Sequence, residues 1–162
     1  MEQQETRLRA WICHGLQRLG LGAAAVALLG LTAPQMAVAQ TGAAIVVQSD
    51  RGGMLGQRSQ QIRQLRASGQ RVELRGTCLS ACTMYLSLPN VCVAATASFG
   101  FHGPSRNQRA LPPVEFEHWS EVMARNYREP LRSWFLSEAR YRITGYYELS
   151  GAELIRMGYA AC

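Results

Sequence analysis

The chain contains no lysine, because all 17 of its basic residues are arginine. A catalytic serine–lysine pair is therefore excluded. Aspartate is almost missing as well, and Asp50 is the single example. We find no internal repeat, no low-complexity tract and no metal-binding or nucleotide-binding motif, so the sequence predicts neither a metal nor a cofactor.

Residues 1–39 have the features of a cleavable secretory signal. Three arginines precede an uncharged apolar run over residues 19–33, and Pro34 ends any helix there because it lacks a backbone donor. The small residues before Gln40 fit a signal peptidase, so we place the cut after Ala39. An uncleaved anchor is the alternative, since the apolar span is about long enough to cross a bilayer.

Export predicts a periplasmic or secreted protein that meets the membrane only during translocation. The remaining residues, 40–162, have the length of one domain. This part retains four cysteines, namely Cys78, Cys82, Cys92 and Cys162. An even number in an oxidising compartment predicts two disulfides with three pairings open. A zinc site is disfavoured, because there is no CxxC pair and no histidine cluster.

The formal net charge is +6 at pH 7. Such a charge can attract nucleic acid or lipid headgroups. The arginines of the exported part, however, are spread from Arg51 to Arg156 without a block, and an exported protein does not meet nucleic acid. We therefore interpret the charge as a solvated basic surface and expect no nucleic-acid partner.

The hydrophobic pattern predicts an α/β domain with strands alternating with helices, which favours parallel βαβ units. The expected elements are a strand at 43–49, a helix at 54–67, a strand at 71–76, a short helix within 77–88, and a third strand at 91–95 that leads to residues 98–102. A long helix follows over 114–139, split by Pro130, with an apolar stripe interpreted as core. Ser150 and Glu153 form a capping-box pattern for a last helix, and a closing strand is expected at 159–162.

Two glycines and a serine each follow a predicted strand. Gly52-Gly53 lacks Cβ atoms, so the backbone can approach a ligand there, although plain turns also use glycine. Ser80 stands where a helix begins, beside free N–H groups that can stabilise an oxyanion. Taken alone, Ser80 is better explained as a helix cap, which needs no chemistry.

His102 stands at the end of another predicted strand, before a Gly-Pro turn. Histidine takes up a proton near neutral pH, so it can act as a general base towards a serine on the neighbouring strand. The simple alternative is an exposed histidine in a turn. We expect His118, on the long helix, to face solvent.

In combination, a strand followed by Gly-Gly, a G-x-x-x-S-A segment opening a helix, and a strand running into a hydrophobic-His-x-Pro segment resemble the Clp-type serine peptidases. The pattern is similar to the wider crotonase-like superfamily, and most of all to its cysteine-containing periplasmic members. The segment from Leu149 to Tyr159 resembles the closing helix and strand of the family. The resemblance implies repeated ββα units, a mostly parallel sheet with helices packed outside, and a homo-oligomer.

Carried over to this chain, the resemblance implies that Ser80 is the nucleophile and His102 its general base. The N–H groups of Gly53 and Ala81 would form the oxyanion hole. The turn before Gly53 is one residue longer than in the family. The acidic third member of the family falls near Tyr146, so Glu148, two residues away, is the candidate for orienting His102. The alternative is a Ser-His pair that acts without an acid.

Cys78 and Cys82 flank Ser80 and would brace its turn, which leaves Cys92 to pair with Cys162. A thiol nucleophile at Cys78 or Cys82 is the alternative, disfavoured by export. These features predict a hydrolase that acts on a peptide, as a peptidase does, or on a small ester or amide. The competing prediction is a catalytically inactive binding or assembly module on the same fold, since a fold does not determine activity. Acyl-CoA chemistry is disfavoured because coenzyme A is cytoplasmic.

Overall fold

A computed structural model describes residues 42–162 of the chain. The predicted signal sequence and the cut after Ala39 lie outside the described residues. Within residues 42–162, no helix is both long enough and apolar enough to cross a membrane.

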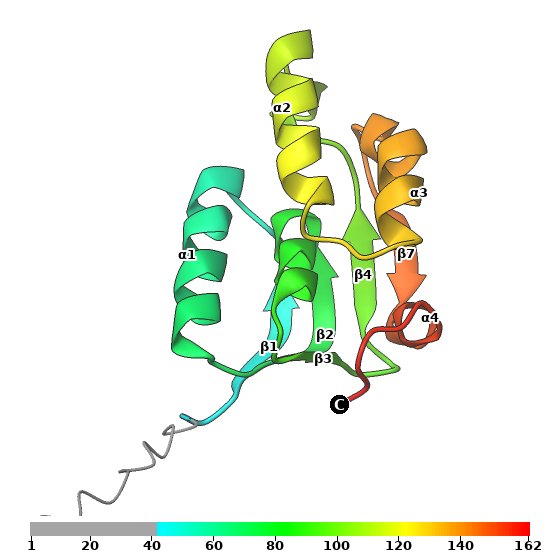
Figure 1. The fold of residues 1–162 in the computed structure, drawn as a ribbon. Helices are drawn as coiled ribbons and strands as arrows, with labels where there is room; N and C mark the ends of the chain where they lie inside the picture. The colour runs from blue at the N-terminus through cyan, green and yellow to red at the C-terminus, as the bar shows by residue number, and fades with distance from the viewer. Residues whose placement is uncertain (1–41) are drawn as a thin grey trace, which may run out of the picture. The chain divides into compact units, whose positions relative to one another are not determined.

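A five-stranded sheet forms the centre of this part of the chain (Figure 1). Its strands are β1 (Ile45–Asp50), β2 (Val72–Leu79), β3 (Val91–Val93), β4 (Ser98–Phe101) and β7 (Tyr147–Ser150). Strand β2 pairs in parallel with β1 on one edge; on the other it pairs first with β3 and then with β4, both parallel. Strand β7 pairs antiparallel with β4. The predicted α/β class with a mostly parallel sheet is confirmed.

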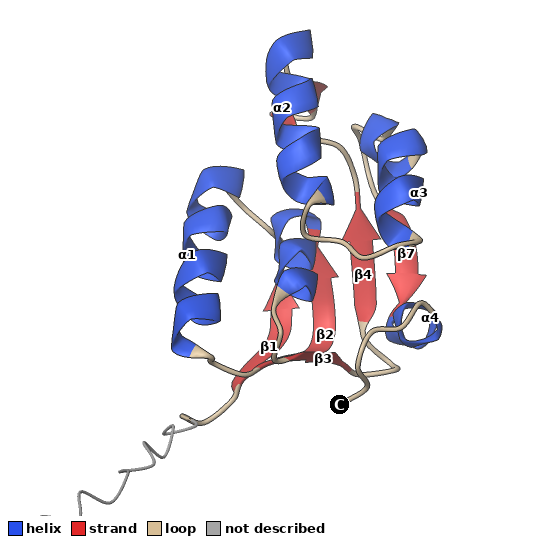
Figure 2. Cartoon of the chain, viewed as in Figure 1, coloured by secondary structure: helices blue, strands red, loops and turns tan. Residues whose placement is uncertain are grey.

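The main helices gather on one side of this sheet (Figures 1 and 2). They are α1 (Leu55–Ser68), the 3-10 helix η1 (Ser80–Ser87), α2 (Pro113–Ala124) and α3 (Leu131–Ser137), with α4 (Gly151–Arg156) and the 3-10 turn η2 (Ala139–Tyr141) near the end of the chain. Residues from all four main helices join one apolar cluster, for example Ile62, Leu86, Met123 and Phe135.

The strands contribute alternate side chains to this cluster. On β2, Val72, Leu74 and Cys78 are buried, whereas Arg75 between them is exposed. Successive strand residues point to opposite faces, so a single apolar face is enough to hold the helices. The arrangement is one helical layer on one sheet, and the sheet carries polar side chains on its other face.

Strand β2 runs to Leu79, three residues beyond the predicted end at Gly76. Gly76 does not end the strand; a Cβ atom there would collide with the carbonyl of Gln48 on β1. The register of β1 and β2 shifts at the same level, between Val47 and Ser49. This glycine therefore permits a close approach of two strands, a use that the sequence pattern alone could not distinguish from a turn.

The second half of the chain agrees with the sequence-based expectations in some elements and differs in others. The long helix is indeed interrupted around Pro130, and Ser150 caps α4 with the reciprocal Glu153 bond of a capping box. The predicted closing strand is reduced to one isolated bridge between Val93 and Ala161. Strand β7 and the small hairpin of β5 (Ser105–Arg106) and β6 (Arg109–Ala110) were not predicted.

Candidate functional site

Ser80 lies at the turn from β2 into η1. Its φ angle is +56°, in the left-handed region that residues other than glycine rarely adopt. Holding a serine there costs on the order of 1–2 kcal/mol. Each N–H group in a helix bonds a carbonyl one turn earlier in the chain. Because Ser80 opens η1, the first N–H groups of this helix, Ala81 among them, have no such carbonyl within it.

The hydroxyls of Thr83 and Tyr127 form a hydrogen-bonded chain that ends at the carbonyl of Ser80. Thr83 Oγ1 donates to the carbonyl of Ser80 at 2.7 Å and lies 2.7 Å from the hydroxyl of Tyr127. Since the single proton of Thr83 goes to Ser80, Tyr127 donates to Thr83. Burial raises the pKa of Tyr127 strongly, so it keeps the proton that this arrangement requires.

A disulfide between Cys78 and Cys82 spans the same turn, with Cα atoms 5.3 Å apart. The second disulfide joins Cys92 and Cys162, with Cα atoms 4.9 Å apart. Both pairings agree with those preferred from the sequence. All four sulfur atoms are consumed, so neither Cys78 nor Cys82 has a thiol that could act as a nucleophile in this state.

The glycine turn before α1 lies directly against Ser80, through Gly52. A Cβ atom on Gly52 would approach Ser80 Cβ to 2.7 Å and the Ala81 nitrogen to 3.0 Å. The φ angles are +98° at Gly52 and +122° at Gly53, and a Cβ atom on Gly53 would meet nothing within 4 Å. Gly52 is therefore the glycine that packs closely against Ser80. Gly53 follows it in the chain, and the space beside its α-carbon is open.

His102 directly follows β4, which lies next to β2. In the parallel register Leu79 is opposite Gly100, so Ser80 and His102 both follow the carboxyl ends of neighbouring strands. This end of a parallel sheet is where α/β proteins place their ligand sites. The structure thus brings the predicted serine, histidine and glycine turn to one edge of the fold.

Burial lowers the pKa of His102 below its usual range. The imidazole is accordingly neutral at pH 7, as a general base must be. Within residues 42–162 its buried Nδ1 atom has no hydrogen-bond partner. Among the described residues, no carboxylate therefore bonds Nδ1 to orient this ring.

Tyr146 and Glu148, the two positions considered for an orienting group, behave differently. The Tyr146 ring meets the His102 ring edge to face, with centroids 5.2 Å apart. Glu148 pairs with Gly100 across β4 and β7, and its carboxylate accepts a hydrogen bond from the Ser98 hydroxyl. Glu148 is on a neighbouring strand, but it does not bond Nδ1 of His102.

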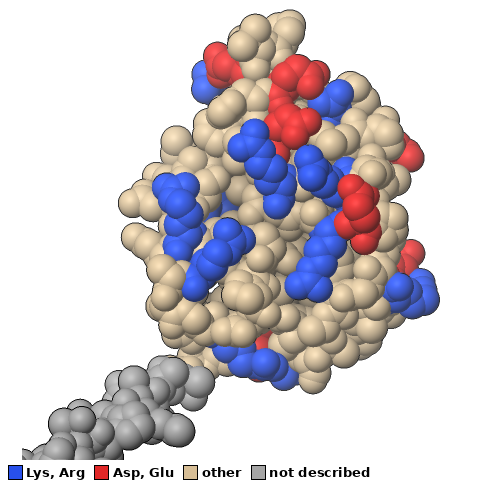
Figure 3. All heavy atoms as spheres, viewed as in Figure 1, with Lys and Arg blue, Asp and Glu red and all other residues tan. Residues whose placement is uncertain are grey.

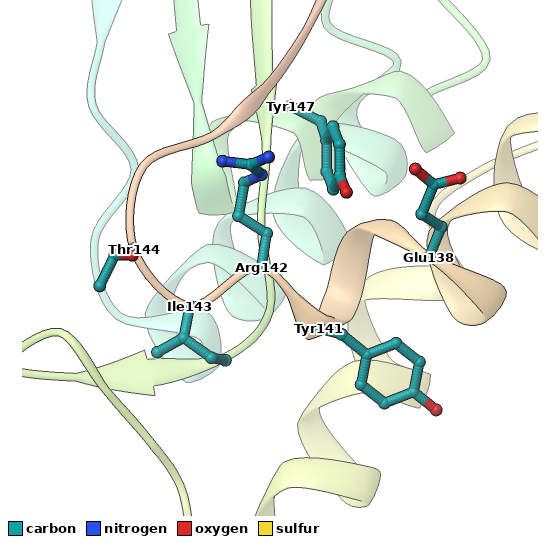
Figure 4. A pocket seen from close by; sticks show the side chains of 6 residues that line it. All are labelled: Glu138, Tyr141, Arg142, Ile143, Thr144 and Tyr147. Atoms are coloured by element: carbon teal, nitrogen blue, oxygen red, sulfur yellow. The ribbon is translucent and has the colours of Figure 1, made fainter.

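A hollow opens beside His102. It is lined by His102, Ser105, Gln108, Ile143, Thr144, Gly145 and Tyr146. A second hollow shares Ile143 and Thr144 with it, and Figure 4 shows the side chains that line it. There the Arg142 guanidinium lies 4.1 Å from the centre of the Tyr147 ring. This contact joins the two residues that flank the segment 143–146, to which Tyr146 belongs.

Glu73 lies with Cys92 and Cys162, and their ligand atoms fall within 4.8 Å of one another. The two sulfur atoms are joined in the disulfide and are not thiolates. The carboxylate of Glu73 is bonded to Arg71 at 2.9 Å and to Arg75 at 2.7 Å, and these bonds lower its pKa. The cluster is therefore a disulfide beside an ion-paired carboxylate and not a set of metal ligands.

The helix-covered face carries many arginines (Figure 3). They are spread over the surface and are separated by uncharged side chains, with acidic groups among them towards the α2 end. This distribution agrees with the solvated basic surface inferred from the sequence.

The sequence named the Gly52-Gly53 pair without showing which of the two glycines approaches Ser80, and it missed Thr83 and Tyr127. Both glycines carry the same sequence signal, and the turn that holds them is one residue longer than in the family that the sequence resembles. Thr83 stands three residues after Ser80, a spacing at which a hydroxyl can reach back to a carbonyl. Tyr127 had no distinguishing signal, because its position on the apolar stripe explains it fully as core.

No family model and no curated protein matches the chain.

Proposed function

We propose that this chain is an exported serine–histidine hydrolase of the Clp/crotonase-like kind, acting on a peptide or a small ester or amide. The observation that carries the proposal is Ser80, held with a left-handed backbone at the end of β2, one strand away from His102. Such strain persists only where the surroundings over-determine it, and it clusters at functional sites.

In this proposal the Ser80 hydroxyl attacks the carbonyl carbon and His102 takes its proton. The negative charge on the carbonyl oxygen is stabilised by the N–H groups of Gly53 and Ala81. His102 then protonates the leaving amine or alcohol, and water releases the acyl group by the reverse sequence. The buried, neutral imidazole and the free N–H groups at the start of η1 support these roles.

The two disulfides are compatible with an oxidising compartment. Together with the features of residues 1–39, they support a periplasmic or secreted location as part of the proposal.

A fluorophosphonate probe tests the proposal directly. The Ser80 oxygen would form a bond to phosphorus, fluoride would leave, and His102 would accept the serine proton. We expect labelling of the purified protein that is lost in S80A and reduced by at least about 10²-fold in H102A, the contribution typical of a general base. The S59A variant, a serine on α1, is the matched control and should label like the wild type.

The second candidate is a catalytically inactive binding or assembly module. It is favoured by His102, whose Nδ1 atom lacks an orienting acid within the described residues and whose ring lies against Tyr146. A folded wild type that the probe does not label would support this candidate and overturn the hydrolase.

A further inference from the structure

A partly buried ion pair lies behind the glycine turn, and none of the proposed catalytic steps uses it. Arg58 on α1 is only 8% exposed, and its Nη2 atom lies 2.6 Å from Oδ2 of Asp50 at the end of β1. Asp50 is the only aspartate in the chain. Such a pair is costly to bury, so its presence at this turn calls for an explanation.

Both backbone groups of Gly52 are held by this pair. The N–H of Gly52 donates to Oδ1 of Asp50 at 2.8 Å, and the carbonyl of Gly52 accepts from Nη2 of Arg58 at 3.2 Å. One carboxylate and one guanidinium thus hold the peptide groups on either side of the Gly52 α-carbon.

The same guanidinium also reaches the helix that Ser80 opens. Its central carbon lies 4.3 Å from the centre of the Tyr85 ring on η1, and its Nη1 atom donates to Gln61 at 3.1 Å. Arg58 therefore contacts the turn on one side and η1 on the other, while Gly52 lies against Ser80.

We propose that Asp50 and Arg58 are positioning residues that hold the Gly52 turn against Ser80, so that the amide of Gly53 keeps a fixed place beside the nucleophile. This inference rests on the proposed function. The pair acts through Gly52, and neither residue touches substrate in this account. Its effect should therefore appear in the rate at which Ser80 reacts and not in the protonation of His102.

The test compares D50N, R58Q and the double variant D50N/R58Q with R63Q, which changes an exposed arginine on the same helix. Fluorophosphonate labelling of Ser80 is measured against pH at a temperature where near-UV circular dichroism shows each variant folded. We expect the plateau rate to fall at least tenfold in D50N and in R58Q. The pH midpoint set by His102 should stay where it is in the wild type.

The double variant should be no slower than the slower single variant, because both changes break one unit. R58K keeps the charge but loses the planar fork that reaches both acceptors, so it should recover the rate only in part. R63Q should match the wild type. Folded D50N and R58Q variants that label at the wild-type rate would overturn the positioning role and leave the hydrolase intact.

A readout independent of catalysis separates the two proposals. If the wild type is not labelled, the hydrolase is overturned, and amide hydrogen exchange at Gly52 then decides the positioning role. Exchange at Gly52 should be at least tenfold faster in R58Q than in R63Q, although R58Q leaves the Asp50 acceptor in place. Equal exchange rates in these two variants would show that the pair does not hold the turn.

Discussion

The ring of Tyr146 meets the ring of His102 edge to face, with the ring centroids 5.2 Å apart. Tyr146 also packs on Gly100, where a Cβ atom would lie 3.0 Å from its Cγ. The tyrosine thus occupies the space beside the histidine without offering a negative charge to Nδ1.

Replacing this tyrosine by an acid should strengthen the base. In Y146D the new carboxylate lies near His102 and favours the imidazolium, so the pKa of His102 rises. We expect the midpoint of fluorophosphonate labelling to move to higher pH and the plateau rate to increase about tenfold or more, since an orienting acid contributes strongly to such pairs. Y146N is the uncharged control; equal behaviour of the two variants would contradict this expectation.

The burial of His102 predicts a pH dependence of both reactivity and stability. Because burial lowers its pKa in the folded state, labelling should reach half its plateau below pH 6.5, the ordinary value for histidine. The unfolded chain binds the proton more readily, so the free energy of unfolding should decrease as the pH falls below 6.5. Urea titrations at several pH values measure this, and H102Q should make the curve flatter in that window. A wild-type curve no steeper than that of H102Q would be the contrary result.

The two glycines of the turn should respond differently to the same change. In G52A the new methyl group meets Ser80 and backbone atoms at 2.7–3.0 Å in addition to a disfavoured φ, so we expect a loss of stability of about 3 kcal/mol or more. G53A has the backbone strain alone, on the order of 1–3 kcal/mol. Chemical denaturation measures both, and G53A at least as destabilising as G52A would show that the close approach is misplaced.

The hydroxyls of Thr83 and Tyr127 should affect both the stability of the fold and the reactivity of Ser80. In Y127F, Thr83 loses its buried donor, and we expect a loss of about 1–1.5 kcal/mol in the free energy of unfolding. T83V removes the bond to the Ser80 carbonyl as well and should also lower the labelling rate of Ser80. Y159F, a change at another largely buried tyrosine, is the control, and a T83V rate equal to that of Y159F would contradict the supporting role.

Much of this fold could be predicted because its strands and helices are separated by clear turn signals. The parallel sheet, the break around Pro130 and the cap at Ser150 all follow from local chemistry. Strand β7 could not be predicted, because its residues pair with β4 from far along the chain and carry no run of β-formers. The end of β2 was misplaced since a glycine for close strand approach has the same pattern as a glycine in a turn.

The sequence was sufficient to name the residues of the candidate site. It was not sufficient to predict how these residues contact one another. His102 was expected at the end of a strand and Ser80 at the start of a helix, and their flanking residues indicated both positions. The support of Ser80 by Thr83 and Tyr127 depends on contacts over 44 positions, which no local pattern specifies. The choice between Gly52 and Gly53 depends on which α-carbon touches η1, and only the packing decides that.

The left-handed backbone at position 80 also has a consequence for protein engineering. Glycine would adopt the same geometry without a steric penalty, so S80G should be among the most stabilising single changes in this region. Directed evolution for heat resistance alone would therefore tend to discard the hydroxyl, and a library built for that purpose needs a reactivity screen alongside the thermal one.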